Sequence, residues 1–133
     1  MRRQFDLPER DMLYLNALGL PWETLGAKGV GHVLIHDFPT PQGYTESKVT
    51  VALQIDAGYD DTQIDMAYFS PALVRSDGKS IGALATKAID GKTFQRWSRH
   101  RTSANPWRPG EDYLGTHMAL VEEWLTREFV LKP

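Results

Sequence analysis

Apolar and polar residues alternate along several stretches in the first half of the chain. The clearest is KVTVALQID, residues 48–56, which has valine, leucine or isoleucine at every second position, and residues 63–69 repeat the pattern. A period of two is typical of a half-buried β-strand. Residues 31–38 and the stretch WETLGAK, residues 22–28, are two further predicted strands. The connections between strands are short and rich in turn residues, which favours an antiparallel meander because parallel strands need long crossovers.

Helical periodicity marks both ends of the chain. Residues 7–18 predict a short helix, with Pro8 at its first position and Asp6 as a candidate cap. Residues 112–130 predict a longer helix capped by Asp112, because apolar residues recur on one stripe of the helical surface. The stripe contains Leu114, His117, Leu120, Val121, Trp124, Leu125 and Phe129. His117 is therefore expected to lie in the core as a hydrogen-bonded histidine.

Two stretches between the strands and the last helix show no sustained period. Residues 71–93 are expected to be mostly irregular and to cover one edge of the sheet, and residues 94–107 to be irregular and packed through their tryptophans. The order of elements predicts an α+β fold in which helices pack against one face of an antiparallel sheet. The length of 133 residues suits a single domain, residues 1–133.

Composition restricts the classes of function. The net charge is −2, so any attraction to nucleic acid or to a membrane must come from a local patch. The chain has no cysteine, which excludes disulfides, thiolate metal sites and thiol catalysis. No apolar run approaches the ~18 residues of a membrane helix, and the N-terminal residues lack the apolar region of a secretory signal. A soluble cytoplasmic protein without a membrane partner is expected.

No metal or cofactor site is predicted. His32 and His36 are four residues apart, but no carboxylate completes a ligand set for zinc. The stretch AGYDDTQID, residues 57–65, has three aspartates without the spacing of a calcium loop. The sequence also contains no glycine-rich phosphate loop.

The stretch FQRWSRHRTSANPW, residues 94–107, combines cationic and aromatic side chains and has no acidic residue. Such a segment is compatible with a nucleic-acid contact, with an anion site, or with a loop whose side chains bind to their own protein. In an extended segment, side chains two residues apart project to the same side. One side then carries Ser98, His100 and Thr102, and the other carries Trp97, Arg99 and Arg101.

One interpretation of this segment is catalytic. The hydroxyl of Ser98 needs a neighbouring base to become a nucleophile, and His100 is the nearest group with a suitable pKa range. The guanidinium groups of Arg99 and Arg101 are candidates for stabilising an oxyanion on an attacked acyl group. In the alternative interpretation, Ser98 and His100 only hydrogen-bond the backbone and fix the segment.

Other residues of the segment are candidates for binding. Trp97 and Trp107 are expected to be core or anchor residues, and Thr102 is a further candidate contact. Surface acids are expected to pair with the arginines of the segment. The candidates for this pairing are Asp60, Asp61 and Asp65.

Three stretches in this order resemble the ubiquitin-conjugating (UBC) superfamily. They are GYDDTQIDMAYFSP, FQRWSRHR and NPWRPGEDYLGTHMALVEEWL, whose Trp107 and Pro109 fall in register with the W-x-P segment of that superfamily. The last two are similar to a bacterial branch, prokaryotic E2 family E, and the resemblance extends over roughly residues 7–128. It implies a UBC-like fold: an N-terminal helix, an antiparallel four-strand meander, a long irregular active-site segment and a C-terminal helix.

The resemblance also implies partners for this chain. The sequence differs from the superfamily in the residues that carry out catalysis. The implied partners are a ubiquitin-like protein and a ThiF-type activating enzyme, the latter facing the first helix. The histidine-proline-asparagine tripeptide is absent, Arg99 stands about where the catalytic cysteine belongs, and a thioester is impossible without a cysteine thiol. Two functions remain open: an acyl carrier that holds the ubiquitin-like tail as an oxyester on Ser98, and a catalytically silent adaptor. Binding of nucleic acid through the arginines has less support because the net charge is −2.

Overall fold

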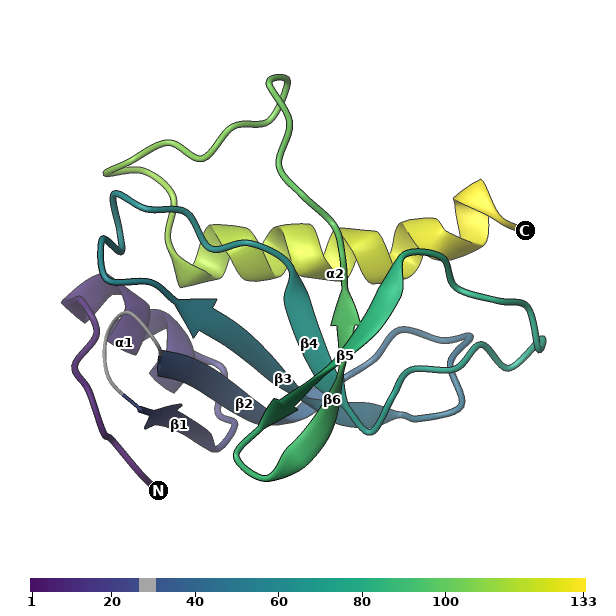
Figure 1. Cartoon of the computed structure of the whole chain (residues 1–133), viewed down its shortest axis with the longest axis horizontal. Coiled ribbons are helices and arrows are strands. Elements are labelled where there is room, and N and C mark those ends of the chain that lie inside the picture. Colours follow the sequence, from purple (N-terminus) through teal and green to yellow (C-terminus); the bar gives the residue numbers. More distant parts are fainter. Residues whose placement is uncertain (27–30) are drawn as a thin grey trace.

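The computed structural model describes residues 1–26 and 31–133. Helices α1 and α2 pack on the same face of one sheet (Figure 1). The elements in chain order are α1 (Glu9–Ala17), β1 (Trp22–Leu25), β2 (Gly31–Pro39), β3 (Lys48–Ile55), β4 (Ala67–Ser70), β5 (Leu84–Ile89), β6 (Lys92–Trp97) and α2 (Leu114–Leu131). In the described part of the chain, no helix is long and apolar enough to cross a membrane.

Both predicted helices are present, and their ends lie within two residues of the prediction. The predicted caps are wrong. Pro8, rather than Asp6, precedes the first turn of α1, and no side chain caps that helix. Asp112 lies before α2, but its Oδ2 accepts a hydrogen bond of 2.7 Å from the backbone N–H of Arg108. Periodicity therefore located the helices correctly but did not identify how their first turns are capped.

A buried carboxylate joins the two helices. Oδ1 of Asp11, in α1, accepts hydrogen bonds from the backbone N–H of Leu114 (3.0 Å) and from the hydroxyl of Tyr59 (2.9 Å). The first N–H groups of a helix have no partner inside the helix, so a carboxylate from another element satisfies one of them at the positive end of α2. Burial raises the pKa of Asp11. This contact fixes α1 against the point where the chain enters α2.

The described residues form a six-stranded antiparallel sheet of order β1-β2-β3-β4-β6-β5, so the prediction of four strands is wrong in number. Strands β1 to β4 form the predicted meander. The first predicted strand is present as Trp22–Leu25, while its residues 27 and 28 lie outside the described residues. Strand β4 is shorter than predicted, because Met66 has φ of 60°, outside the β region.

The two strands missing from the prediction form a hairpin, β5–β6. They occupy the second half of residues 71–93 and the start of residues 94–107, so the expectation that these stretches are irregular is wrong for residues 84–97 and holds for residues 71–83. The turn is Asp90–Gly91, with φ of 53° and 72°. A two-residue type I′ turn needs positive φ at both positions, and Asp-Gly is one of its preferred pairs. This local signal was available in the sequence.

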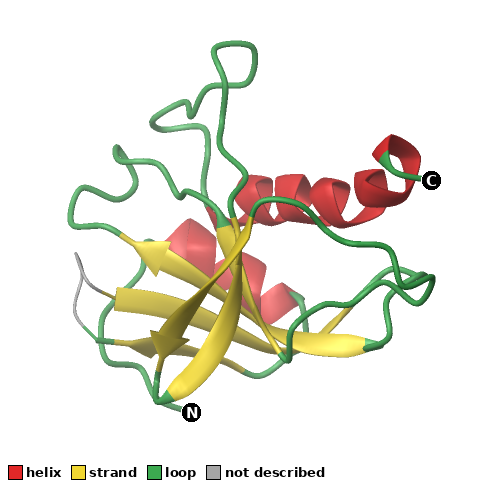
Figure 2. Ribbon diagram, turned by 45° about the vertical axis from the view of Figure 1, so that its right-hand side comes forward, coloured by secondary structure: helices red, strands yellow, loops and turns green. Residues whose placement is uncertain are grey.

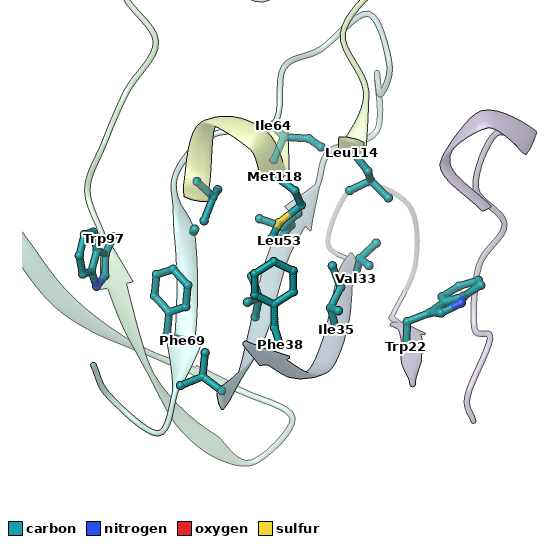
Figure 3. Close-up of a cluster of buried hydrophobic side chains, with 14 of the residues drawn as sticks. Trp22, Val33, Ile35, Phe38, Leu53, Ile64, Phe69, Trp97, Leu114 and Met118 are labelled. Atoms are coloured by element: carbon teal, nitrogen blue, oxygen red, sulfur yellow. The ribbon is translucent and has the colours of Figure 1, made fainter. Parts of the chain in front are cut away.

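The main core lies between α2 and the inner face of the sheet (Figure 3). Its buried side chains include Val33, Ile35, Val51, Leu53, Phe69, Leu114, Met118, Val121 and Leu125. Each large apolar side chain of this kind contributes ~1.5–3 kcal/mol when it is removed from water. Trp97, the last residue of β6, is completely buried and packs edge-on against Phe69 and Tyr44. It anchors the start of the irregular segment, as predicted.

The sheet curls so that its two edge strands approach each other on the face opposite α2. Leu25 of β1 and Ile89 of β5 belong to one small buried cluster, although β1 and β5 are at opposite ends of the strand order. Figure 2 shows the twisted sheet with the β5–β6 hairpin folded across it. Arg2 connects the two edges, since its guanidinium hydrogen-bonds both Glu23 of β1 (2.9 Å) and Asp90 of the hairpin turn (2.7 Å).

His117 lies in the core between α2 and the sheet, as predicted, and is completely buried. Its Nε2–H donates to the carbonyl oxygen of Met66 (2.8 Å), so Nδ1 is the acceptor that faces the guanidinium of Arg101 (3.4 Å). Burial lowers the pKa of His117 to about 4. The imidazole is therefore neutral in the folded protein at neutral pH.

The free energy of unfolding is expected to fall as the pH drops from about 6.5 to about 4. In this window the unfolded chain binds a proton at His117 that the folded protein does not, so acid favours unfolding. The full loss is about 3 kcal/mol, from the difference of the two pKa values. Urea unfolding across this range should show the slope, and His117→Gln should reduce it by the contribution of this histidine. An unchanged slope in the variant would contradict the buried neutral histidine.

Candidate active site

The irregular segment begins at Ser98, where β6 ends, and runs to the start of α2 (Figure 1). The backbone N–H of Ser98 donates to the carbonyl oxygen of Ala83 (3.0 Å), just before β5. Beyond Ser98 the chain leaves the sheet, so the following side chains no longer alternate between two faces as they do in a strand. Residues 98–113 are thus held at one end by Trp97 and at the other by α2.

Ser98 lies at a hollow of about 320 Å³ between the irregular segment and the C-terminal half of α2. Its lining residues are Ser98, Arg99, His100, Trp124, Arg127, Glu128 and Leu131. Ser98 is half-buried. The hollow therefore brings together three of the predicted catalytic residues, Ser98, Arg99 and His100.

His100 is paired with a carboxylate from another part of the chain. Its Nδ1 lies 3.0 Å and 3.1 Å from the two carboxylate oxygens of Asp65, and 61% of its side chain is exposed. Because an ionised carboxylate only accepts hydrogen bonds, Nδ1 is the donor, and Nε2 has no partner in the described part of the chain. Among the described residues, Ser98 and His100 form no hydrogen bond to each other. The imidazole and the hydroxyl belong to residues that line the same hollow, but the described structure has no hydrogen bond between them.

Asp65 is the residue of this site that the sequence did not reveal, since it was predicted only as a partner of arginines. Strands β4 and β6 are antiparallel neighbours, with Ala67 opposite Trp97. Residues just before β4 therefore lie beside residues just after β6, which places Asp65 near His100. The pairing of β4 with β6, which are not consecutive in the chain, is what brings Asp65 to His100. The sequence analysis missed this pairing because it did not predict the β5–β6 hairpin.

Arg99 is held by contacts within the protein. Its Nη1 donates to the carbonyl oxygen of Gly82 (3.1 Å), and its guanidinium lies 4.8 Å from the ring centre of Trp97. Its Nη2 is 3.9 Å from the buried carboxylate of Glu128. The guanidinium thus stands at the wall of the Ser98 hollow in a fixed orientation.

Arg101 is nearly buried and faces away from the Ser98 hollow, with only 6% of its side chain exposed. Its guanidinium lies 4.0 Å from the carboxylate of Asp112, 3.4 Å from Nδ1 of His117 and 4.9 Å from the ring centre of Trp107. Burial lowers the pKa of Arg101, although Asp112 acts in the opposite direction. The contacts join both ends of the irregular segment to the core histidine.

Trp107 and Thr102 line a second and larger hollow, of about 450 Å³. The hollow also contains Arg101, Asp61, Gln63, Ser103, Pro106 and Pro109. The indole N–H of Trp107 donates to the carbonyl oxygen of Asp60 (2.8 Å). Trp107 therefore ties the irregular segment to the connection before β4. Of the predicted site residues, Ser98, Arg99 and His100 line one hollow, Arg101, Thr102 and Trp107 line the other, and Trp97 is buried in the core.

The acidic partners of the arginines differ from those predicted. Arg99 and Arg101 lie against Glu128 and Asp112, which belong to α2 and its approach, whereas Asp65 pairs with His100. Of the three possibilities for this cationic segment, the contacts favour a loop whose side chains bind to their own protein. The hydroxyl of Ser98 and Nε2 of His100 are the exceptions, since neither has a hydrogen-bond partner among the described residues, and both residues line the hollow.

The comparison with protein families agrees with this geometry. Residues 7–128 match the family model described as Prokaryotic E2 family E, which covers most of the chain. No curated protein and no solved structure matches. The matched residues include β6, the irregular segment and all of α2 except its last three residues. The chain belongs to prokaryotic E2 family E.

Proposed function

We propose that this E2-like protein accepts the C-terminal acyl group of a ubiquitin-like protein on the hydroxyl of Ser98, as an oxyester. Membership of the family indicates an E2-like protein of bacterial ubiquitin-like conjugation. Because the chain has no cysteine, the acyl group must bind to oxygen or nitrogen. The observation that carries the proposal is the His100–Asp65 pair at the hollow that Ser98 lines.

In the proposed reaction, the acyl group of the ubiquitin-like protein moves from a thioester to an oxyester. The oxygen of Ser98 attacks the thioester carbonyl of the ubiquitin-like protein on its activating enzyme, which we propose to be of the ThiF type. Nε2 of His100 takes the hydroxyl proton, Asp65 stabilises the imidazolium, and the departing thiolate of the enzyme takes up the proton. The exposed imidazole must first turn toward Ser98, since the two are not bonded in the structure.

The arginines have different roles in this proposal. Arg99, at the wall of the hollow, is the cation that faces an oxyanion formed on the attacked carbonyl. Arg101 lies at the other hollow with Trp107 and Asp112, so it is a positioning residue that fixes the irregular segment. Trp97, fully buried, has the same role at the start of the segment.

Incubation with the cognate ubiquitin-like protein, its activating enzyme and ATP should give a covalent adduct with the properties of an ester. It should survive a thiol reductant and be lost in hydroxylamine, whereas an isopeptide would survive both. Ser98→Ala should abolish the adduct, and His100→Ala should slow its formation by roughly 10²-fold because the general base is lost. The measurement is adduct intensity against time on denaturing gels.

Ser103→Ala is the matched control, because Ser103 is a hydroxyl of the same segment that lines the other hollow. It should form the adduct at the rate of the unchanged protein. Asp65→Asn should slow the reaction less than His100→Ala, since the imidazole remains but loses its orienting carboxylate. An adduct that persists in Ser98→Ala would move the acceptor to Thr102 or Ser103.

A catalytically silent adaptor is the second candidate function. Arg99, Arg101, Trp97 and Trp107 are engaged within the protein, and the Ser98 hydroxyl has no bonded base. Helix α1, in contrast, exposes apolar surface, with 38% of Met12 and 63% of Leu13 accessible. Exposed apolar residues on one element are typical of a contact surface. In both candidate functions, α1 is the surface proposed to face the activating enzyme.

Met12→Glu and Leu13→Glu should each weaken binding of the activating enzyme, by about tenfold or more, because a buried charge replaces an apolar contact. Isothermal titration or surface plasmon resonance would measure the affinity. Val74→Glu is the control, since Val74 is equally apolar and 51% exposed but lies in the connection between β4 and β5. Unchanged affinity in both α1 variants would remove α1 from the interface. Affinity without any adduct would favour the adaptor.

A further inference from the structure

A row of polar side chains crosses the face of the sheet opposite α2. Four neighbouring strands contribute one residue each: Glu23 of β1, His36 of β2, Thr50 of β3 and Ser70 of β4. Thr50 and Ser70 are directly paired in the register of β3 and β4. Their neighbours along the strands point into the main core, so the row itself points to the outer face. The Ser98 segment has no part in this row.

Three members of the row form a continuous hydrogen-bonded line. Nε2 of His36 lies 2.7 Å from Oε2 of Glu23, and Nδ1 lies 3.1 Å from the hydroxyl oxygen of Thr50. Arg2 donates to the other carboxylate oxygen of Glu23 (2.9 Å). These bonds hold the pKa of Glu23 down at about 2, with Arg2 as the main cause. Glu23 of β1 is therefore the carboxylate partner of His36, which the sequence analysis did not predict.

The carboxylate fixes the state of the imidazole. Because ionised Glu23 only accepts hydrogen bonds, the proton of the neutral His36 ring is on Nε2, and Nδ1 presents a lone pair to the hydroxyl of Thr50. This tautomer is the one that a general base needs. The arrangement of hydroxyl, imidazole and carboxylate is the geometric requirement for an activated oxygen nucleophile. Ser98, by comparison, has no bonded imidazole.

The row opens into a pocket of about 280 Å³ beneath the β5–β6 hairpin. Apolar contacts in it come from Leu34, Pro71 and Phe94, while Lys92 and Arg2 supply positive charge and Asp90 supplies a further negative charge. The size and the lining suit a small acyl group with a short apolar body. The ammonium of Lys92 is the group of the pocket available to an oxyanion, since Arg2 is already bonded to Glu23 and Asp90.

We propose that Thr50, His36 and Glu23 form a second nucleophilic site, which takes a small acyl group from an activated ester. The oxygen of Thr50 attacks the ester carbonyl and its proton moves to Nδ1 of His36. The new bond joins Thr50 to the acyl carbon, the ester bond to the leaving alcohol breaks, and His36 returns the proton to that alcohol. Water can then hydrolyse the acyl-threonine by the same route.

The test uses the full chain and p-nitrophenyl acetate, with release of p-nitrophenol and intact mass as readouts. Peptide mapping should locate an acetyl group on Thr50. Thr50→Val, which keeps the shape of the side chain, should abolish this label, and Thr50→Ser should retain it. His36→Gln should slow acetylation of Thr50 by roughly 10²-fold or more, because the base is lost. Circular dichroism and the melting temperature would confirm that each variant is folded.

His32→Gln is the matched control, because His32 lies on the same strand but contacts Lys87 instead of Thr50. It should acetylate Thr50 at the rate of the unchanged protein. Acetylation confined to lysines and the N-terminus, or a Thr50 label that is independent of His36, would overturn the proposal. The experiment needs neither a ubiquitin-like protein nor an activating enzyme, so its outcome is independent of the function proposed for Ser98.

Discussion

The buried guanidinium of Arg101 is the contact on which the arrangement of the candidate site depends. It joins Asp112, at the entry to α2, to His117 in the core, and it lies over the ring of Trp107. A buried charge is costly without partners, so the three contacts must form together. Because His117 is also bonded to the carbonyl oxygen of Met66, the irregular segment, α2 and the start of β4 are fixed relative to one another. The Ser98 hollow lies between this irregular segment and the C-terminal half of α2.

Among the described residues there are two imidazole–carboxylate pairs: His100–Asp65 beyond the end of β6, and His36–Glu23 on the outer face of the sheet. His100 uses Nδ1 to bind Asp65 and leaves Nε2 free at an exposed hollow, which suits a site that receives a tail from another protein. His36 is bonded on both nitrogens, so the hydroxyl of Thr50 is already engaged in a smaller pocket. The two histidines therefore differ in whether a hydroxyl is already hydrogen-bonded to the imidazole.

The sequence was sufficient where a signal is local and insufficient where a contact joins distant elements. Period-two and helical patterns located both helices and the first four strands, and the motif around Trp107 indicated the family. The β5–β6 hairpin was missed although Asp90–Gly91 signals its turn, because apolar and polar residues do not alternate in LATKAI. Asp65 and Glu23 were not assigned to their histidines, because strand pairing, rather than sequence spacing, brings each carboxylate to its partner.

The most direct measurement is to locate the acyl bond after the protein has reacted with its ubiquitin-like protein, activating enzyme and ATP. Digestion at mildly acidic pH preserves an ester, and tandem mass spectrometry identifies the residue that carries the remnant of the tail. The remnant should be on the oxygen of Ser98, in the peptide that contains His100. A remnant on a lysine, or on Thr50 of the outer face, would contradict the assignment of the irregular segment as the acceptor site.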